Sequence, residues 1–275
     1  MIKSYAKINL HLGVLGRLSN NFHKIETLIC FSDLHDKLYI KKSNYKNHQV
    51  KFNGKFSSDI TKNSSIHKLF KILDKTKLLD GKKFDVNITK NIPLKSGMGG
   101  GSMNAATLLN YLIKRLKLKL KRKQIEEICN RIGSDVILGI NRKPKIIFGN
   151  NKIKDLKKKI KFHIVLLKPR FGCKTSRIYE NLNKFSHPLF NFKDIEKKNF
   201  KEFRNDLETS AFKIYPSLLK IKKEMEKLQN IHFARMTGSG SVIIAYFLRK
   251  KDAMTGTKYL KKKYKNYWCI LSKTI

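Results

Sequence analysis

The chain has 275 residues, 41% of them hydrophobic, and a formal net charge of +41. These values suit a globular protein of one or two domains rather than a disordered or fibrous chain. The high positive charge makes nucleic-acid binding one candidate function. However, it is spread along the whole sequence, and only ten of the 61 basic residues are arginine, the residue best suited to reading bases. We therefore expect no specific nucleic-acid partner and expect the charge to attract an anionic small substrate.

The cysteines and the apolar runs indicate in which cellular compartment the protein works. Cys30, Cys129, Cys173 and Cys269 show no Cys-x-x-Cys spacing, so neither a disulfide framework nor a zinc site is predicted. No apolar run approaches the length of a membrane span. The first residues lack the apolar core of a signal peptide. We expect a cytoplasmic protein with no membrane partner.

The first half of the chain mixes alternating apolar patterns with helical spacing. The predicted elements are a strand over 5–15, a turn over 16–21, a strand over 24–31, strands of the same antiparallel group over 38–42 and 49–52, a helix over 64–77, a strand over 85–89, and helices over 103–118 and 123–132.

The second half begins after a lysine-rich stretch, 150–161, which we interpret as a domain boundary or a long surface hairpin. The predicted elements that follow are a strand over 162–167, helices over 200–212 and 216–229, a strand pair over 233–236 and 242–247, a helix over 252–263 and a strand over 267–272.

A glycine-rich loop between the strand at 85–89 and the next helix is the strongest functional signal. Four glycines fall within residues 97–101. Glycine allows close backbone approach to a ligand, and a helix start offers unpaired N–H groups and partial positive charge. Together they predict a phosphate site, with Ser102 as the expected helix cap. The loop does not end in Gly-Lys-Ser/Thr as a Walker A loop does, and only partly fits the dinucleotide fingerprint. A ligand-free turn is the structural alternative.

Three further segments have both structural and functional interpretations. Lys7 and Asn9 share one face of the strand at 5–15, a face that is more often simply solvated. Asp135 follows Gly133 at the end of a helix, where aspartate is more often a turn residue. The small-residue segment 237–241 is either a hairpin turn or a backbone that closes over a ligand.

Taken together and in this order, these segments resemble the GHMP kinases, which include galactokinase, homoserine kinase and mevalonate kinase. The resemblance spans nearly the whole chain and rests on residues 6–10, on the loop at 93–106 and on the loop at 237–240. It implies a two-domain α+β fold with domains at 1–155 and 156–275 and the active site in the cleft between them. Residues 16–17, 22–23, 26–28 and 133–137 favour the branch that acts on a cytidine diphosphate-linked methylerythritol.

The resemblance also assigns roles. It implies transfer of the γ-phosphoryl group of ATP, with Mg²⁺, to a tertiary hydroxyl, in the non-mevalonate route to isoprenoid precursors. No cluster of protein side chains is expected to hold a resident metal. A monomer or weak homodimer is expected. Lys7 and Asp135 would be the catalytic pair, with Asp135 orienting the hydroxyl rather than acting as a strong base.

The ATP phosphates would lie against the residues Pro93, Leu94, Lys95, Ser96, Gly97, Met98, Gly99, Gly100, Gly101, Ser102 and Met103. The substrate would contact Asn9, Phe22, His23, Thr175, Tyr179, Gly238, Ser239 and Gly240. Two alternatives stay open, a family member that acts on another small alcohol such as homoserine or mevalonate, and a basic nucleic-acid-binding protein.

Overall fold

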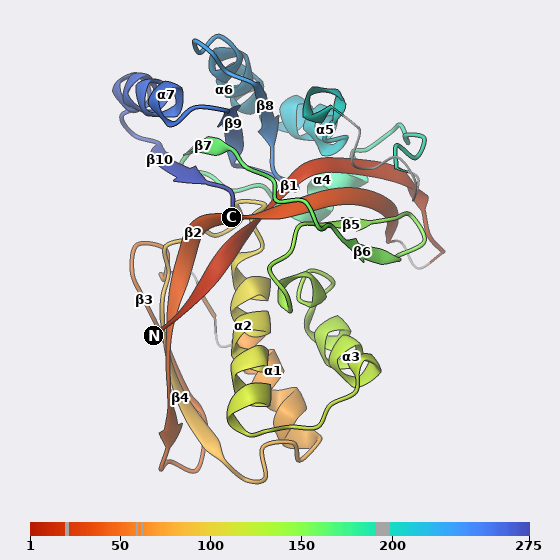
Figure 1. The fold of residues 1–275 in the computed structure, drawn as a ribbon, viewed down its shortest axis with the longest axis vertical. Helices are drawn as coiled ribbons and strands as arrows, with labels where there is room; N and C mark the ends of the chain where they lie inside the picture. The colour runs from red at the N-terminus through yellow and green to blue at the C-terminus, as the bar shows by residue number, and fades with distance from the viewer. Residues whose placement is uncertain (20–21, 59, 62, 191–198) are drawn as a thin grey trace. The chain divides into compact units, whose positions relative to one another are not determined.

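The computed structural model describes residues 1–19, 22–58, 60–61, 63–190 and 199–275 (Figure 1). The chain divides into two compact units. The first comprises residues 1–7, 34–94 and 99–142, and the second comprises residues 8–33, 95–98 and 143–275. The turn predicted at 16–21 ends in residues 20–21, which lie outside the described residues.

Two long strands, β1 (Ile2–Arg17) and β2 (His23–Ser43), pair with each other. The sequence predicted two strands where β2 runs without interruption, because residues 32–37 are polar apart from Leu34 but contain no glycine or proline to end the strand. Every residue from Ala6 to Val14 is buried. The expectation that Lys7 and Asn9 stand on a solvated face is therefore wrong, since β1 is covered on both sides.

The first unit packs three helices against one face of a sheet (Figure 1). Strand β3 pairs parallel with β4, and β4 pairs antiparallel with β2. The predicted antiparallel placement of residues 49–52 is thus wrong, because a helix connects β3 to β4 and a crossover of this kind returns the chain in the same direction. Leucines 69, 73, 108, 109 and 112 form the centre of the core. The elements are β3 (Gln49–Asn53), α1 (Ser65–Lys75), β4 (Lys83–Thr89), α2 (Gly100–Arg115), α3 (Arg122–Ile132) and a 3-10 turn, η1 (Ile137–Gly139).

The second unit contains a four-stranded antiparallel sheet in the order β10-β7-β9-β8. Helices α6 and α7 cover one face, where Leu218, Ile221 and Leu260 meet Val165 and Phe247 (Figure 1). The elements are β5 (Lys145–Ile147), β6 (Ile153–Asp155), β7 (His163–Lys168), α4 (Thr175–Glu180), a 3-10 turn, η3 (Phe200–Glu202), α5 (Leu207–Ile214), α6 (Pro216–Glu226), β8 (Phe233–Met236), β9 (Ile243–Phe247), α7 (Lys250–Lys263) and β10 (Trp268–Lys273).

The helix predicted over 200–212 is wrong in its first half. The chain makes one 3-10 turn at η3 and becomes helical again only at Leu207. Between them, Leu12 donates its N–H to the carbonyl of Arg204 at 2.8 Å, and Asp206 donates its N–H to the carbonyl of Leu12 at 2.9 Å. These bonds to β1 take backbone groups that a helix would need, so tertiary pairing overrides the helical spacing of the apolar residues.

Each of the four cysteines lies in the described part of the chain and is a buried free thiol. Burial raises the pKa of Cys129 to about 12 and the pKa values of Cys173 and Cys269 to about 11. Among the described residues, no helix combines the length and the apolar character needed to cross a membrane.

Candidate active site

Lys7 and Asp135 form an ion pair in the first unit. The Lys7 ammonium lies 3.1 Å from Asp135 Oδ2, and the side chains are 6% and 40% exposed. Strand β1 fixes Lys7, while Asp135 follows the end of α3. One partner is thus held rigidly by the strand, and the other presents a carboxylate toward solvent. The two residues that the sequence predicted as a catalytic pair, 128 positions apart, are brought together.

The glycine loop meets this pair at the start of α2. Gly99 precedes the helix with a φ of +64°, in the left-handed region that favours glycine. A Cβ atom on Gly99 would lie 3.3 Å from Lys7 Cε and 3.6 Å from Asp135 Oδ2. The first N–H groups of α2 therefore begin directly beside the ion pair. Ser102 stands within the first turn rather than before it, so its predicted role as the cap is wrong, and Gly99 occupies that position without a side-chain hydrogen bond.

A buried ion pair supports the entry to the loop. Lys90 Nζ contacts Asp36 Oδ2, and both side chains are almost fully buried. Asp36 Oδ1 accepts hydrogen bonds from the N–H groups of Asn91 and Ile92 at 2.7 and 2.8 Å. A Cβ atom on Gly100 would lie 3.4 Å from Lys90 Nζ. Asp36 thus fixes both the backbone that leads into the loop and a cation beneath the helix start.

The first half of the loop, residues 95–98, packs in the second unit against residues 237–242. Ser241 donates its N–H to the Lys95 carbonyl at 3.3 Å, and Val242 donates to the Ser96 carbonyl at 3.4 Å. A Cβ atom on Gly97, whose φ is +75°, would lie 1.9 Å from the carbonyl oxygen of Thr237. Two small-residue loops far apart in sequence are therefore in backbone contact, which only glycine permits.

The predicted ATP-binding residues differ in their exposure. Pro93, Ser96 and Met98 are buried, whereas Lys95 and Gly101 are exposed. Met103 is buried, with its sulfur close to Gly139, and its N–H donates to the Gly99 carbonyl at 2.9 Å. Within this loop, an anion would therefore reach the Lys95 side chain and the backbone at Gly101 most readily.

Asn9 links β1 to two threonines of the second unit. Its N–H donates to Thr237 Oγ1 at 2.9 Å, and its side-chain amide donates to Thr27 Oγ1 at 2.8 Å. The hydroxyls of Thr175 and Ser239 lie 2.9 Å apart. Predicted substrate residues from β1, from the start of α4 and from the loop at 237–240 therefore share one hydrogen-bonded neighbourhood.

An aromatic group forms around His23. The ring centroids of His23 and Tyr179 are 4.7 Å apart, and those of His23 and Phe185 are 6.4 Å apart. Phe22 is 69% exposed. Burial, with Arg17 nearby, lowers the pKa of His23, so its imidazole is neutral at pH 7. Within the described residues, His23 Nε2 is buried without a hydrogen-bond partner. The group offers aromatic faces, which suit a planar ring.

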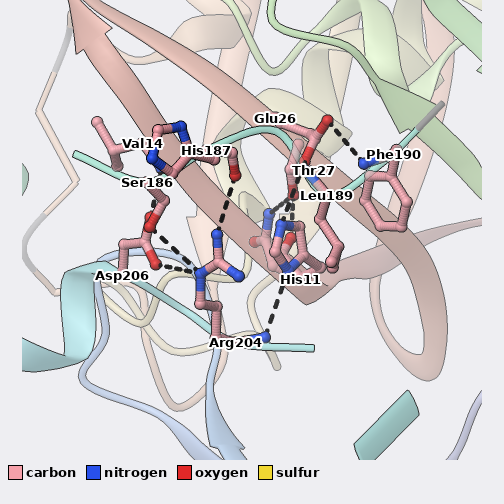
Figure 2. Close-up of polar contacts among 11 residues, drawn as sticks. His11, Val14, Glu26, Thr27, Ser186, His187, Leu189, Phe190, Arg204 and Asp206 are labelled. Carbon is pink, nitrogen blue, oxygen red and sulfur yellow. Dashed lines mark hydrogen bonds and ion pairs between the residues drawn. The ribbon is translucent and has the colours of Figure 1, made fainter. Parts of the chain in front are cut away.

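A buried polar network lies beside this group (Figure 2). The imidazole of His11 and the carboxylate of Glu26 are almost fully buried, and His11 Nε2 lies 3.6 Å from Glu26 Oε1. Burial lowers the pKa of His11 despite the nearby carboxylate. Burial alone would raise the pKa of Glu26, but the nearby His11 imidazole and the hydrogen bonds from the N–H groups of Leu189 and Phe190 lower it overall. The network therefore holds a neutral imidazole beside an ionised carboxylate.

This network predicts a loss of stability in mild acid. Below pH 6.5 the unfolded chain protonates His11, whereas the folded chain resists protonation because its pKa is lowered. The contribution of the neutral His11 to the free energy of unfolding is present in full well above pH 6.5. It falls as the pH drops, by up to about 1.4 kcal/mol per pH unit for one group. Urea unfolding at several pH values between 5 and 7 should give a flatter profile for His11→Gln than for the wild type. Identical slopes would contradict this assignment.

Sequence reasoning missed several residues of the site. Thr27, Asn205 and Phe185 had no predicted role, yet Asn205 donates from Nδ2 to the carbonyls of Met236 and Gly238, each at 2.8 Å. Asn205 and Phe185 carry no local pattern, and Thr27 was noted only within the family match at 26–28, without a role. Only their contacts across the fold identify them.

Comparisons with known proteins agree with this geometry. The model of the GHMP kinase N-terminal domain matches residues 64–144, and that of the GHMP kinase C-terminal domain matches residues 189–266. The chain is 51% identical to the 4-diphosphocytidyl-2-C-methyl-D-erythritol kinase of Pelagibacter ubique, over all of this chain and 98% of the relative. It is 32% identical to the protein of the same name from Clostridium perfringens, again over all of this chain and 98% of the relative.

A solved structure shows the same fold. The crystal structure of a 4-(cytidine 5'-diphospho)-2C-methyl-D-erythritol kinase superposes with a TM-score of 0.82 at 20% identity, covering 99% of this chain and 98% of that chain. Two matched domain models, close full-length relatives and a shared α+β fold lead to one assignment. The chain belongs to the GHMP kinase family.

Proposed function

We propose that this kinase transfers the γ-phosphoryl group of ATP to the 2-hydroxyl of 4-diphosphocytidyl-2-C-methyl-D-erythritol. The products are the 2-phosphate and ADP, in the non-mevalonate route to isoprenoid precursors. The observation that carries the proposal is the 51% identity over the whole chain with the Pelagibacter ubique kinase of that name. The aromatic group around His23 supports it, because cytosine is a planar ring with hydrogen-bonding edges.

The chain's own residues suit phosphoryl transfer. The reaction passes through a loose transition state, so positioning and charge neutralisation supply most of the catalysis. The helix start at Gly100 would bind the phosphates, and Lys7 would offset charge on the transferred group. Asp135 would orient the hydroxyl. A bond forms from the hydroxyl oxygen to the γ-phosphorus, the bond to the bridging oxygen of ADP breaks, and the hydroxyl proton leaves toward Asp135 or water.

Mg²⁺ fits the donor set at this helix start. Magnesium typically binds phosphates of the substrate and one or two carboxylates while keeping several waters. The half-exposed carboxylate of Asp135, beside Gly99, meets that need. Within the described ranges no three His, Cys, Asp or Glu side chains gather as metal ligands, and such a cage is not required. When bound, the ion would neutralise phosphate charge, with Asp135 as the protein group that holds it.

Other features of the protein follow from the same proposal. We place the boundary between the two family domains near residue 155, supported by family matches that end at residue 144 and resume at residue 189; the compact units of the fold differ from this division, since the second unit also includes residues 8–33 and 95–98. Four free thiols suit a reducing compartment, and we propose the cytoplasm. We also propose a monomer or weak homodimer that binds no nucleic acid specifically.

A coupled assay of ADP release tests the proposed reaction. The wild type should release ADP with the cytidine-linked substrate and Mg²⁺-ATP, and remain near background with homoserine or mevalonate. Mass spectrometry of the product should show one added phosphate. Activity on another alcohol, with none on the cytidine-linked compound, would assign the chain to a different reaction within the family.

A further inference from the structure

An irregular segment in the second unit, residues 181–190, is fastened to β1 and β2 at several points. Ser186 donates its N–H to the Val14 carbonyl at 2.8 Å. The N–H groups of Leu189 and Phe190 donate to the two oxygens of Glu26 at 2.7 and 3.1 Å. One carboxylate on β2 therefore binds two consecutive backbone groups of this segment, as Figure 2 shows.

Arg204 and Asp206 provide a second attachment. Arg204 donates to Ser186 Oγ at 3.3 Å and to the His187 carbonyl at 3.1 Å, and its guanidinium pairs with Asp206 at 3.0 Å. Asp206 Oδ2 accepts the N–H of Val14 at 2.8 Å. Figure 2 shows these side chains converging on Ser186 from one side while Glu26 reaches the segment from the other.

The cost of burying Glu26 shows how firmly this attachment is built. Its side chain is 1% exposed, and an ionised carboxylate is expensive to remove from water unless its oxygens are paired. Here two backbone N–H groups donate to its two oxygens, and the His11 imidazole lies 3.6 Å from Oε1. Glu26 stands three residues after His23 on β2, so the same strand carries the aromatic group and the anchor of the segment.

Phe185 is the residue that this fastening places beside His23. It comes directly before Ser186, whose backbone and hydroxyl are both bonded. Its ring lies 6.4 Å from that of His23 and is tilted by 48°, yet the side chain remains 46% exposed. An aromatic ring that is held at a fixed position and remains about half exposed is suited to stacking on a flat ligand.

We propose that Phe185 is a specificity-determining residue that forms a wall of the pyrimidine subsite, and that Glu26 is the positioning residue that holds it there. The proposal rests on the proposed function, because it takes the cytosine of that substrate as the ligand. It adds a third ring to His23 and Tyr179 and gives the buried network of Figure 2 a role in recognition.

Steady-state kinetics with the cytidine-linked substrate test the role of Phe185. Phe185→Ala should raise the KM for this substrate by about 5- to 100-fold, the range for losing one stacked base, and leave the KM for ATP unchanged. Titration calorimetry with cytidine 5'-diphosphate should show the same loss of affinity. Phe185→Tyr, which keeps the ring, should behave as the wild type, and Phe185→Leu should resemble the alanine variant. Tyr45→Ala, at an aromatic residue that is 66% exposed, is the matched control and should change nothing.

Glu26→Gln tests the positioning role. It should raise the same KM, and the double variant Glu26→Gln/Phe185→Ala should bind no more weakly than Phe185→Ala alone, because both changes remove one interaction. A lowered melting temperature with an unchanged KM would overturn the role of Glu26. An unchanged KM in Phe185→Ala would overturn the role of Phe185 while the wild-type activity keeps the proposed function intact. A wild type inactive on this substrate would overturn both.

Discussion

Asp135→Asn is expected to lower kcat by about 100-fold or more, the range seen when a positioned acid–base group or a charge-stabilising donor is removed. Asparagine keeps the size of the side chain but removes the charge that pairs with Lys7 at 3.1 Å. Because Asp135 is 40% exposed and the asparagine oxygen can still accept a hydrogen bond from the buried Lys7 ammonium, the larger loss should fall on turnover rather than on folding. Lys7→Met, which keeps the apolar stem of the lysine, should cause a comparable loss.

The two substitutions should not add. If Lys7 and Asp135 act as a unit, the double variant should be about as slow as the slower single variant. Asp80→Asn is the matched control, because Asp80 also pairs with a lysine, at 2.7 Å, but is 87% exposed and lies outside the proposed site. Single-turnover measurements of the chemical step decide the matter. Near-normal turnover in Asp135→Asn would rule out both an orienting and a basic role for this carboxylate.

Gly97→Ala is expected to lower the free energy of unfolding by about 2–5 kcal/mol, the sum of a left-handed backbone penalty and a steric clash. A Cβ atom at this position would lie 1.9 Å from the Thr237 carbonyl oxygen, so one of the two loops must move. Since the displaced segments contain predicted ATP and substrate residues, activity should fall even at temperatures where the variant stays folded.

Gly81→Ala separates the two causes. Gly81 has a similar φ, +70° against +75° at Gly97, but a Cβ atom there meets nothing within 4 Å. It should therefore lose only about 1–2 kcal/mol, from the backbone penalty alone. Urea unfolding of both variants measures the difference. Equal losses would mean that the contact between Gly97 and Thr237 contributes no steric constraint.

Local patterns predicted much of the fold. The apolar spacing of residues 103–118 identified α2, although the helix begins three residues earlier, because the glycines of the loop enter its first turn. The pairing of β3 with β4 was not predictable from either strand, since direction depends on the intervening connection. The helix predicted for residues 203–206 was wrong for a similar reason, because their hydrogen bonds to Leu12 of β1 are long-range contacts.

The candidate site likewise has features that local sequence predicted and features that only the fold reveals. The glycine loop, Lys7 and Asp135 were all noted from their own local patterns, but only the family resemblance assigned Lys7 and Asp135 a catalytic role. Their pairing at 3.1 Å is a property of the fold. Glu26 and Asn205 each act through two hydrogen bonds to distant backbone groups, and such contacts leave no periodic trace in a sequence. The assigned roles of the ATP and substrate residues stay predictions.

The buried thiols make the protein its own probe of local opening. Cys129 belongs to the first unit, whereas Cys30, Cys173 and Cys269 belong to the second. With raised pKa values and little exposure, all four should resist alkylation until the surrounding structure opens. The order in which they become labelled in rising denaturant would therefore record which unit unfolds first, without any engineered label.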